Sequence, residues 1–225
     1  MSQPWTRCVM IESMDSASNP KPGALPAAFF ERADETDDGG FYQQARLVTH
    51  IDAATIAALT DFYHEVLPAG ADILDLMSSW VSHLPEAARY GRVAGLGMNA
   101  EELAANPRLS ESVVHDLNRD PELPFEDASL DAVVNCVSVQ YLVRPVEVFA
   151  SIRRVLRPGG LSIVAMSHRC FPTKAIRVFH QLGGPERLQL VAHYHTLAGG
   201  FDPIERLDRS PQRGDPLWLV VARRV

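Results

Sequence analysis

Four groups of polar or titratable side chains stand at the ends of predicted strands. They are Asp75, Asp116, the pair Gln140-Tyr141 and the pair His168-Arg169. In open α/β sheets, ligands bind beyond the carboxyl ends of the strands, so these groups are predicted to face one cleft. Cys136 and Val137, which end another predicted strand, are expected to line the same cleft. His168 or Arg169 could there meet an anionic substrate.

Metal binding and cysteine chemistry are not expected. Cys8, Cys136 and Cys170 are odd in number and widely spaced, which argues against a disulfide framework or a zinc finger. His193 and His195 are two residues apart, so a helix would not place them on one face. Cys136 lacks a basic neighbour in the sequence, and buried cysteines are usually inert.

The cleft residues depend on the stretch from Leu123 to Met166 for their placement. An apolar run over 130–137 predicts a strand, and Val146, Phe149, Ile152, Val155 and Leu156 share one face of a following helix. The run Arg157-Pro158-Gly159-Gly160 is expected to stop that helix, and residues 161–166 predict the next strand. Strand, helix and strand with short links indicate a parallel crossover unit.

The other elements fit one α/β domain. A helix is predicted after Asp52, its N-cap, with Ile56, Leu59, Phe62 and Tyr63 on its apolar face. The remaining predicted strands cover 72–76, 92–96, 112–115, 201–207 and 217–221, the last two as a closing hairpin, and helices are predicted over 174–182 and 186–197. Residues 1–40 are interpreted as a mobile arm with a solvated acidic loop, and 41–225 as a single domain.

Composition limits the classes of partner. The chain has 225 residues, and its 21 basic and 28 acidic residues give a net charge of 21 − 28 = −7. This charge argues against nonspecific nucleic-acid binding, which needs a basic surface. No apolar run approaches the roughly 20 residues of a membrane helix, so no membrane partner is expected. The unpaired cysteines favour a cytoplasmic location.

Two stretches carry a family resemblance: LPFEDASLDAVV at 123–134 and RVLRPGGLSIV at 154–164. They resemble the class I S-adenosylmethionine-dependent methyltransferases of the type 11 group, and the match is good from Ala71 to Met166. The resemblance implies a Rossmann-like, doubly wound seven-stranded α/β sheet whose last strands form an antiparallel hairpin. It also implies a cofactor-binding core over 71–166, a cap helix within 41–70 and S-adenosylmethionine as the cofactor.

The first turn departs from the family pattern. The family reads D-x-G-x-G-x-G there, whereas this chain keeps Asp75 but has no glycine from Met77 to Val81. The resemblance implies that Asp75, Met77, Ser78 and Ser79 contact the cofactor. Trp80 is expected either to join the core or to occupy part of the usual pocket.

The second and third strand ends also differ from the family. Gly97 stands where the family has an acid that binds the ribose, and Met98 is expected to pack on the adenine. Asn99 either offers an amide oxygen to the ribose or caps the helix that starts at Ala100. Asp116 either contacts the adenine amino group, beside Leu117 and Asn118, or is a strand-end turn residue.

The family resemblance also implies which residues lie near the methyl acceptor. In the family a helix before the domain covers the cofactor and helps to shape the acceptor pocket, so Tyr42, Arg46 and His50 could point into the site. His50 is the first candidate for a general base, followed by Tyr141 and His83, although His50 could also be a loop residue near a helix cap. Gln140 and Tyr141 fall where many family members place acceptor-facing residues.

The expected function is therefore methyl transfer to a small-molecule acceptor. The alternative is a non-catalytic binding or regulatory protein on the same scaffold, which the lost glycines and the lost ribose acid favour. The acceptor and the oligomeric state are left open by the sequence.

Overall fold

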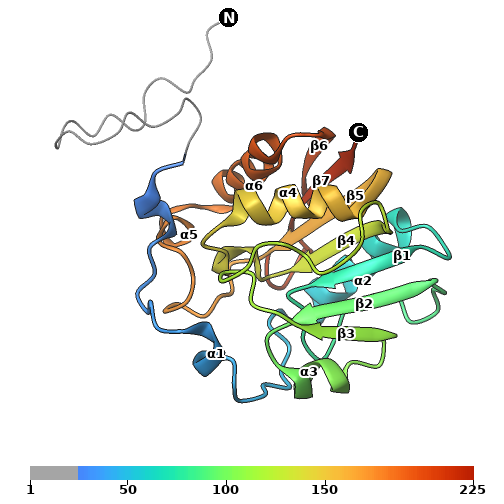
Figure 1. Ribbon diagram of the computed structural model, residues 1–225, viewed down its shortest axis with the longest axis horizontal. Coiled ribbons are helices and arrows are strands. Elements are labelled where there is room, and N and C mark those ends of the chain that lie inside the picture. The colour runs from blue at the N-terminus through green and yellow to red at the C-terminus, as the bar shows by residue number, and fades with distance from the viewer. Residues whose placement is uncertain (1–24) are drawn as a thin grey trace, which may run out of the picture.

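The computed structural model describes residues 25–225, which form a seven-stranded sheet covered by helices (Figure 1). The strand order is β3-β2-β1-β4-β5-β7-β6. The strands are β1 (Asp72–Leu76), β2 (Arg92–Gly97), β3 (Glu111–Val114), β4 (Leu130–Cys136), β5 (Leu156–Met166), β6 (Phe201–Asp208) and β7 (Trp218–Arg224). The helices are η2 (Ala27–Phe30), α1 (Asp38–Phe41), α2 (Ala53–Val66), α3 (Ala100–Ala105), η3 (Val139–Tyr141), α4 (Pro145–Val155), α5 (Arg177–Gln181) and α6 (Gly184–Ala198).

The pairing of the strands confirms the predicted fold class. Strands β3, β2, β1, β4 and β5 are parallel, whereas β7 pairs antiparallel with both β5 and β6. The order reverses at β1, because β2 and β4 lie on its two sides. This reversal opens a crevice at the carboxyl ends of β1 and β4, where α/β proteins bind ligands.

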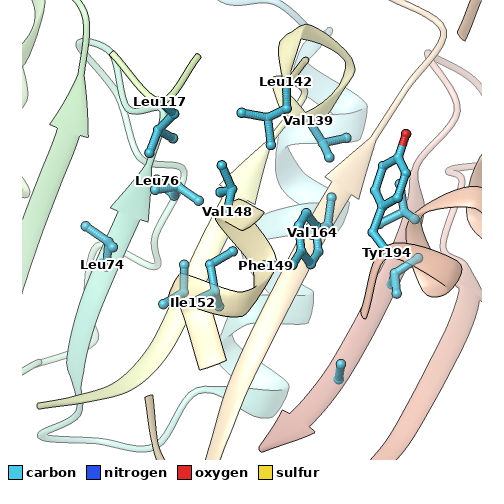
Figure 2. Close-up of a cluster of buried hydrophobic side chains, with 14 of the residues drawn as sticks. Leu74, Leu76, Leu117, Val139, Leu142, Val148, Phe149, Ile152, Val164 and Tyr194 are labelled. Atoms are coloured by element: carbon cyan, nitrogen blue, oxygen red, sulfur yellow. The ribbon is translucent and has the colours of Figure 1, made fainter. Parts of the chain in front are cut away.

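One face of the sheet is covered by α4 and α6. Figure 2 shows Val148, Phe149 and Ile152 of α4 among side chains of the strands and of α6. The apolar positions of α4 recur three and four residues apart, so one side of the helix is buried and the other carries Glu147 and Arg153. Each fully buried large side chain contributes about 1.5–3 kcal/mol of hydrophobic stabilisation.

The opposite face is covered by α2, which precedes the first strand. Leu59, Phe62 and Tyr63 of α2 share a buried cluster with Ile73 and Val93 of β1 and β2. Residues 77–91, which connect β1 to β2, contain no helix. Therefore α2 supplies apolar cover that the β1–β2 crossover lacks.

Residues 25–40 pack on the domain, which differs from the mobile arm expected over 1–40. Residues 1–24 of that expectation lie outside the described residues. Asp38, expected in a solvated acidic loop, is buried and pairs with Arg32 at 2.8 Å and with Lys174 at 3.1 Å. Lys174 is itself fully buried and also pairs with Asp34. Buried charges persist where they are paired, so this ionic cluster anchors the segment to the loop after β5.

The predicted element ends are mostly close to those observed. Asp52 caps α2 as expected, because its side chain accepts a hydrogen bond from the Thr55 amide. The run 157–160 was expected to end the helix before a strand over 161–166. In the structure α4 ends earlier, at Val155, and β5 begins at Leu156 and includes Gly159, whose φ is +81°. None of the helices within residues 25–225 is long and apolar enough to span a bilayer.

Candidate functional site

A cavity of about 130 Å³ lies at the carboxyl ends of β1, β2, β3 and β4, under the chain segment 38–51. One water molecule needs roughly 10–15 Å³ of such cavity volume, so the cavity has room for about ten water molecules. The structure brings together all twelve residues that the sequence assigned to the cofactor, and adds His50 and Tyr141. These wall residues are Asp75, Met77, Ser78, Ser79, Gly97, Met98, Asn99, Asp116, Leu117, Asn118, Cys136, Val137, His50 and Tyr141.

Asp75 supplies a buried charge to the cavity wall. Its side chain is 4% exposed, and its Oδ2 accepts a hydrogen bond from Ser78 Oγ at 2.6 Å. Burial raises the pKa of Asp75 to about 6, against the lowering effect of hydrogen bonds from Ser78 and Ser82. No Lys, Arg or His within residues 25–225 lies within salt-bridge distance of this carboxylate. The wall therefore holds a carboxylate without a counter-ion.

The glycine-free first turn keeps a glycine-like backbone. Met77 stands at the first glycine position of the family pattern, and its φ of +58° lies in the left-handed region. His83 and Val137 also line the cavity with φ of +53° and +49°. Such conformations cost of order 1–3 kcal/mol each in residues other than glycine and concentrate at functional sites.

The same turn explains why Gly97 has no acidic side chain. A Cβ at Gly97 would lie 2.3 Å from the backbone oxygen of Ser78, and Ser78 N donates to Leu96 O at 2.7 Å. The turn backbone thus occupies the space that a side chain at the end of β2 would need. The lost turn glycines and the lost ribose acid are two aspects of one local geometry.

Glu102, which the sequence did not single out, brings another carboxylate to this region. It lies in the first turn of α3 and lines the cavity. Its Oε2 accepts from Ser79 Oγ at 2.6 Å and its Oε1 from the Arg46 amide at 2.7 Å. Each carboxylate oxygen can accept more than one hydrogen bond, so acceptor capacity remains.

Asn99 and Trp80 both contact the chain segment that covers the cavity. Asn99 caps α3, because its Oδ1 accepts from Glu102 N, while its Nδ2 donates to Tyr42 O and Gln43 O. Trp80 belongs to the cavity wall, and its Nε1 donates to Val48 O at 2.9 Å. Both side chains hold the segment 42–48 over the cavity.

The third strand end is a structured turn. Asp116 Oδ1 accepts from Asn118 N at 2.9 Å, as expected of a turn residue, while the side chain still borders the cavity. Asn118 Nδ2 donates to Asp38 Oδ2 and Tyr141 O, and its Oδ1 accepts from Val143 N. Asn118 therefore links α1, through Asp38, to η3, through Tyr141.

Aromatic rings form the cap side of the cavity around Phe171, from the loop after β5. Its ring stacks on Tyr141 at 5.8 Å and meets His50 edge-on at 5.3 Å. Burial raises the pKa of Tyr141 to about 12, so the phenol keeps its proton. Desolvation lowers the pKa of His50, and burial together with the nearby His50 lowers that of His83 to about 4.

Three residues expected near the acceptor lie outside the cavity wall. Gln140 is buried, and its Nε2 donates to Val137 O and Arg169 O, so it serves the loop backbone. His168 and Arg169 both approach Asp215, at 3.3 and 3.1 Å. The loop after β5 turns these two side chains towards the segment before β7, which the sequence did not indicate.

Comparisons with known proteins agree with the fold. Residues 74–164 match the family described as a methyltransferase domain. The resemblance to the type 11 group is thereby confirmed over that range. No curated protein sequence matches the chain.

Solved structures with the same fold share little sequence identity with this chain. The methyltransferase bound to the Trm112 activator from Haloferax volcanii is 17% identical, with a TM-score of 0.58 over 74% of this chain and 88% of that one. The [4+2]-cyclase SpnF is also 17% identical, with a TM-score of 0.56 over 74% and 79%. Haemonchus contortus phosphoethanolamine N-methyltransferase 2, bound to phosphomonomethylethanolamine and S-adenosylhomocysteine, is 16% identical, with a TM-score of 0.54 over 76% and 52%.

Proposed function

We propose that the protein transfers a methyl group from S-adenosylmethionine to a small-molecule acceptor, because residues 74–164 match the methyltransferase-domain family. The domain and the ligand-bound neighbours indicate S-adenosylmethionine as the cofactor. A cytoplasmic location belongs to the same proposal and is supported by the free thiols of Cys136 and Cys170.

The observation that carries the proposal is the carboxylate of Asp75 at the crevice. A buried charge without a counter-ion is costly, and a positively charged ligand removes much of that cost. S-adenosylmethionine bears a sulfonium and an ammonium group, so its charge fits this wall. Ser78 holds the Asp75 carboxylate in place through its hydroxyl.

The nucleoside part fits the remaining walls. Met98, Leu117 and Leu142 offer apolar surface to an adenine, and Asp116 has acceptor capacity beyond its bond to the Asn118 amide. We assign the ribose hydroxyls to Glu102, because a side chain cannot be accommodated at residue 97. Carboxylates are common partners of ribose hydroxyls in nucleotide-binding sheets.

When bound, S-adenosylmethionine supplies an electrophilic methyl group on a positively charged sulfur. The protein must hold the acceptor in line with that group and exclude water, and positioning of this kind can lower a barrier by several kcal/mol. An acceptor hydroxyl or amine must also lose a proton. The lowered pKa of His50 leaves its ring neutral and able to accept that proton, whereas Tyr141 keeps its own proton and can only orient the acceptor.

The test is calorimetric titration of the full chain with S-adenosylmethionine and S-adenosylhomocysteine. Saturable binding is expected for both, and Glu102→Gln should weaken it. No heat up to millimolar ligand would reject the proposal. Adding candidate acceptors and measuring S-adenosylhomocysteine release then tests the transfer itself.

A second candidate is a binding or regulatory protein on this fold. It is supported by the β1–β2 connection, which has no glycine from Met77 to Val81 and contains no helix. Tight cofactor binding without product release across a broad acceptor panel would favour this candidate.

A further inference from the structure

We infer that the acceptor is a small planar molecule bearing a carboxylate, and that Arg46 binds this carboxylate. The inference rests on the proposed function and names the substrate class of the same site. It follows from the one cationic side chain of the cavity wall and from the rings around it.

Arg46 is the only arginine or lysine among the wall residues in the described part of the chain. Its guanidinium donates to two backbone oxygens, those of Phe41 at 2.8 Å and Gln44 at 3.5 Å. No carboxylate of residues 25–225 lies within 4.0 Å of it. A guanidinium has five N–H donors in a planar fork, so several stay available to a ligand.

The position of Arg46 is fixed by the domain. Its backbone amide donates to Glu102, and Asn99 holds the preceding residues through Tyr42 O and Gln43 O. The guanidinium then lies 4.6 Å from the ring centre of Phe41 and 5.5 Å from that of Phe171. Stacking of this kind restricts the side chain before a ligand arrives, which lowers the entropic cost of binding.

The rings define the shape of the acceptor. Phe171 contacts Tyr141 and His50, so flat surfaces border the space beside the guanidinium. Aromatic pairs prefer offset or edge-on contacts at 4.5–7 Å, which a planar ligand can share. Desolvation lowers the pKa values of His50 and His83, so among the wall residues of the described chain the permanent positive charge belongs to Arg46.

The unpaired carboxylates that the described chain contributes to the cavity wall come from other elements than Arg46. Asp75 lies near the end of β1, Asp116 follows β3, and Glu102 lies on α3. The fourth wall carboxylate within residues 25–225, Asp38 of α1, is already paired with Arg32 and Lys174. Arg46 and His50 follow α1, and Phe171 lies in the loop after β5. The strand-end side thus suits the cationic cofactor. The cap side suits an anion, and forked hydrogen bonds from arginine to a carboxylate supply both strength and orientation.

The experiment uses three probes with the same ring and different charge: benzoate, benzamide and benzylamine. Each is titrated by ligand-observed NMR into the full chain saturated with S-adenosylhomocysteine. We expect benzoate to bind at least tenfold more tightly than benzamide. Arg46→Gln should abolish this preference, Arg46→Lys should keep part of it, and Arg89→Gln, which removes the same charge outside the cavity, should leave it unchanged.

Several outcomes would overturn the inference. These are equal or tighter binding of benzamide or benzylamine, no detectable benzoate binding, or a preference that survives in Arg46→Gln. A second arm compares S-adenosylhomocysteine with 5′-methylthioadenosine, which lacks the amino-acid end. If Arg46→Gln weakens only the former, Arg46 holds the cofactor carboxylate and the inference fails. Absence of S-adenosylhomocysteine binding to the wild type would instead defeat the proposed function.

Discussion

Replacing Asp75 by asparagine should stabilise the protein without ligand at neutral pH, although it should harm ligand binding. The folded-state pKa of Asp75 is about 6, against 3.8 as the ordinary value. Ionisation is therefore easier in the unfolded chain, so the stability of the wild type falls as pH rises from about 4 to about 6. An asparagine stays neutral and avoids that loss.

The size of the effect follows from the shift. Two pKa units correspond to about 3 kcal/mol, at roughly 1.4 kcal/mol per unit. This is an upper limit at pH 7.5, because the amide also changes the hydrogen bond from Ser78. Below pH 4 the Asp75 carboxyl of the wild type is mostly protonated in both the folded and the unfolded state, so the wild type and Asp75→Asn should have similar stability.

The assay is urea denaturation of the wild type and Asp75→Asn at pH 4 and pH 7.5. With a denaturant slope of roughly 2–3 kcal/mol/M, the midpoint should rise by about 1 M at pH 7.5 and little at pH 4. The titration of all other groups cancels in this comparison. Binding of S-adenosylmethionine should weaken at least tenfold at pH 7.5, because the cation loses its counter-ion.

Asp131→Asn is the control with the opposite sign. Burial alone would raise the pKa of Asp131, but hydrogen bonds from Arg157 and from the Asp72 amide outweigh it and hold the pKa low. This variant should be less stable than the wild type at pH 7.5, and the difference should shrink as pH falls. The reasoning is refuted if Asp75→Asn is no more stable at pH 7.5, or if its effect is independent of pH.

Three further predictions concern the crevice and its cap. Gly97→Ala should lower the free energy of unfolding in urea by about 1–3 kcal/mol, because the new methyl group overlaps the backbone oxygen of Ser78. Glu102→Gln should weaken adenosine binding in calorimetry and leave 2′,3′-dideoxyadenosine unaffected; an equal loss for both would remove Glu102 from the ribose. Lys174→Met should cost about 3–5 kcal/mol in urea denaturation, because Asp38 loses a buried partner, and an unchanged midpoint would contradict the anchoring role.

Local signals predicted the architecture well. The alternation of apolar strands with an amphipathic helix over 123–166 indicated a parallel crossover, and the structure contains it as β4, α4 and β5. The N-cap of Asp52 depends only on neighbouring residues, so it was predictable. Asp75, Asp116, Cys136 and Val137 also line the cavity as expected, because the topology of an open sheet brings the strand ends together.

Long-range contacts decided the rest. Nothing local showed that the backbone oxygen of Ser78 occupies the side-chain space of Gly97, or that Glu102 and Asn99 hold the cap segment. Asp38 was interpreted as solvated because its neighbours in the sequence are acidic, whereas its partner Lys174 is more than a hundred residues away.

The sequence by itself determined which strands form and where their polar ends meet, because periodicity and turn chemistry act over a few residues. Only the tertiary structure decided which of those polar groups still face the cavity. Gln140, His168 and Arg169 have partners elsewhere in the fold, while Arg46 and Phe171, far apart in the sequence, lie together. The energy of a buried charge depends on its three-dimensional surroundings, which no short stretch of sequence contains.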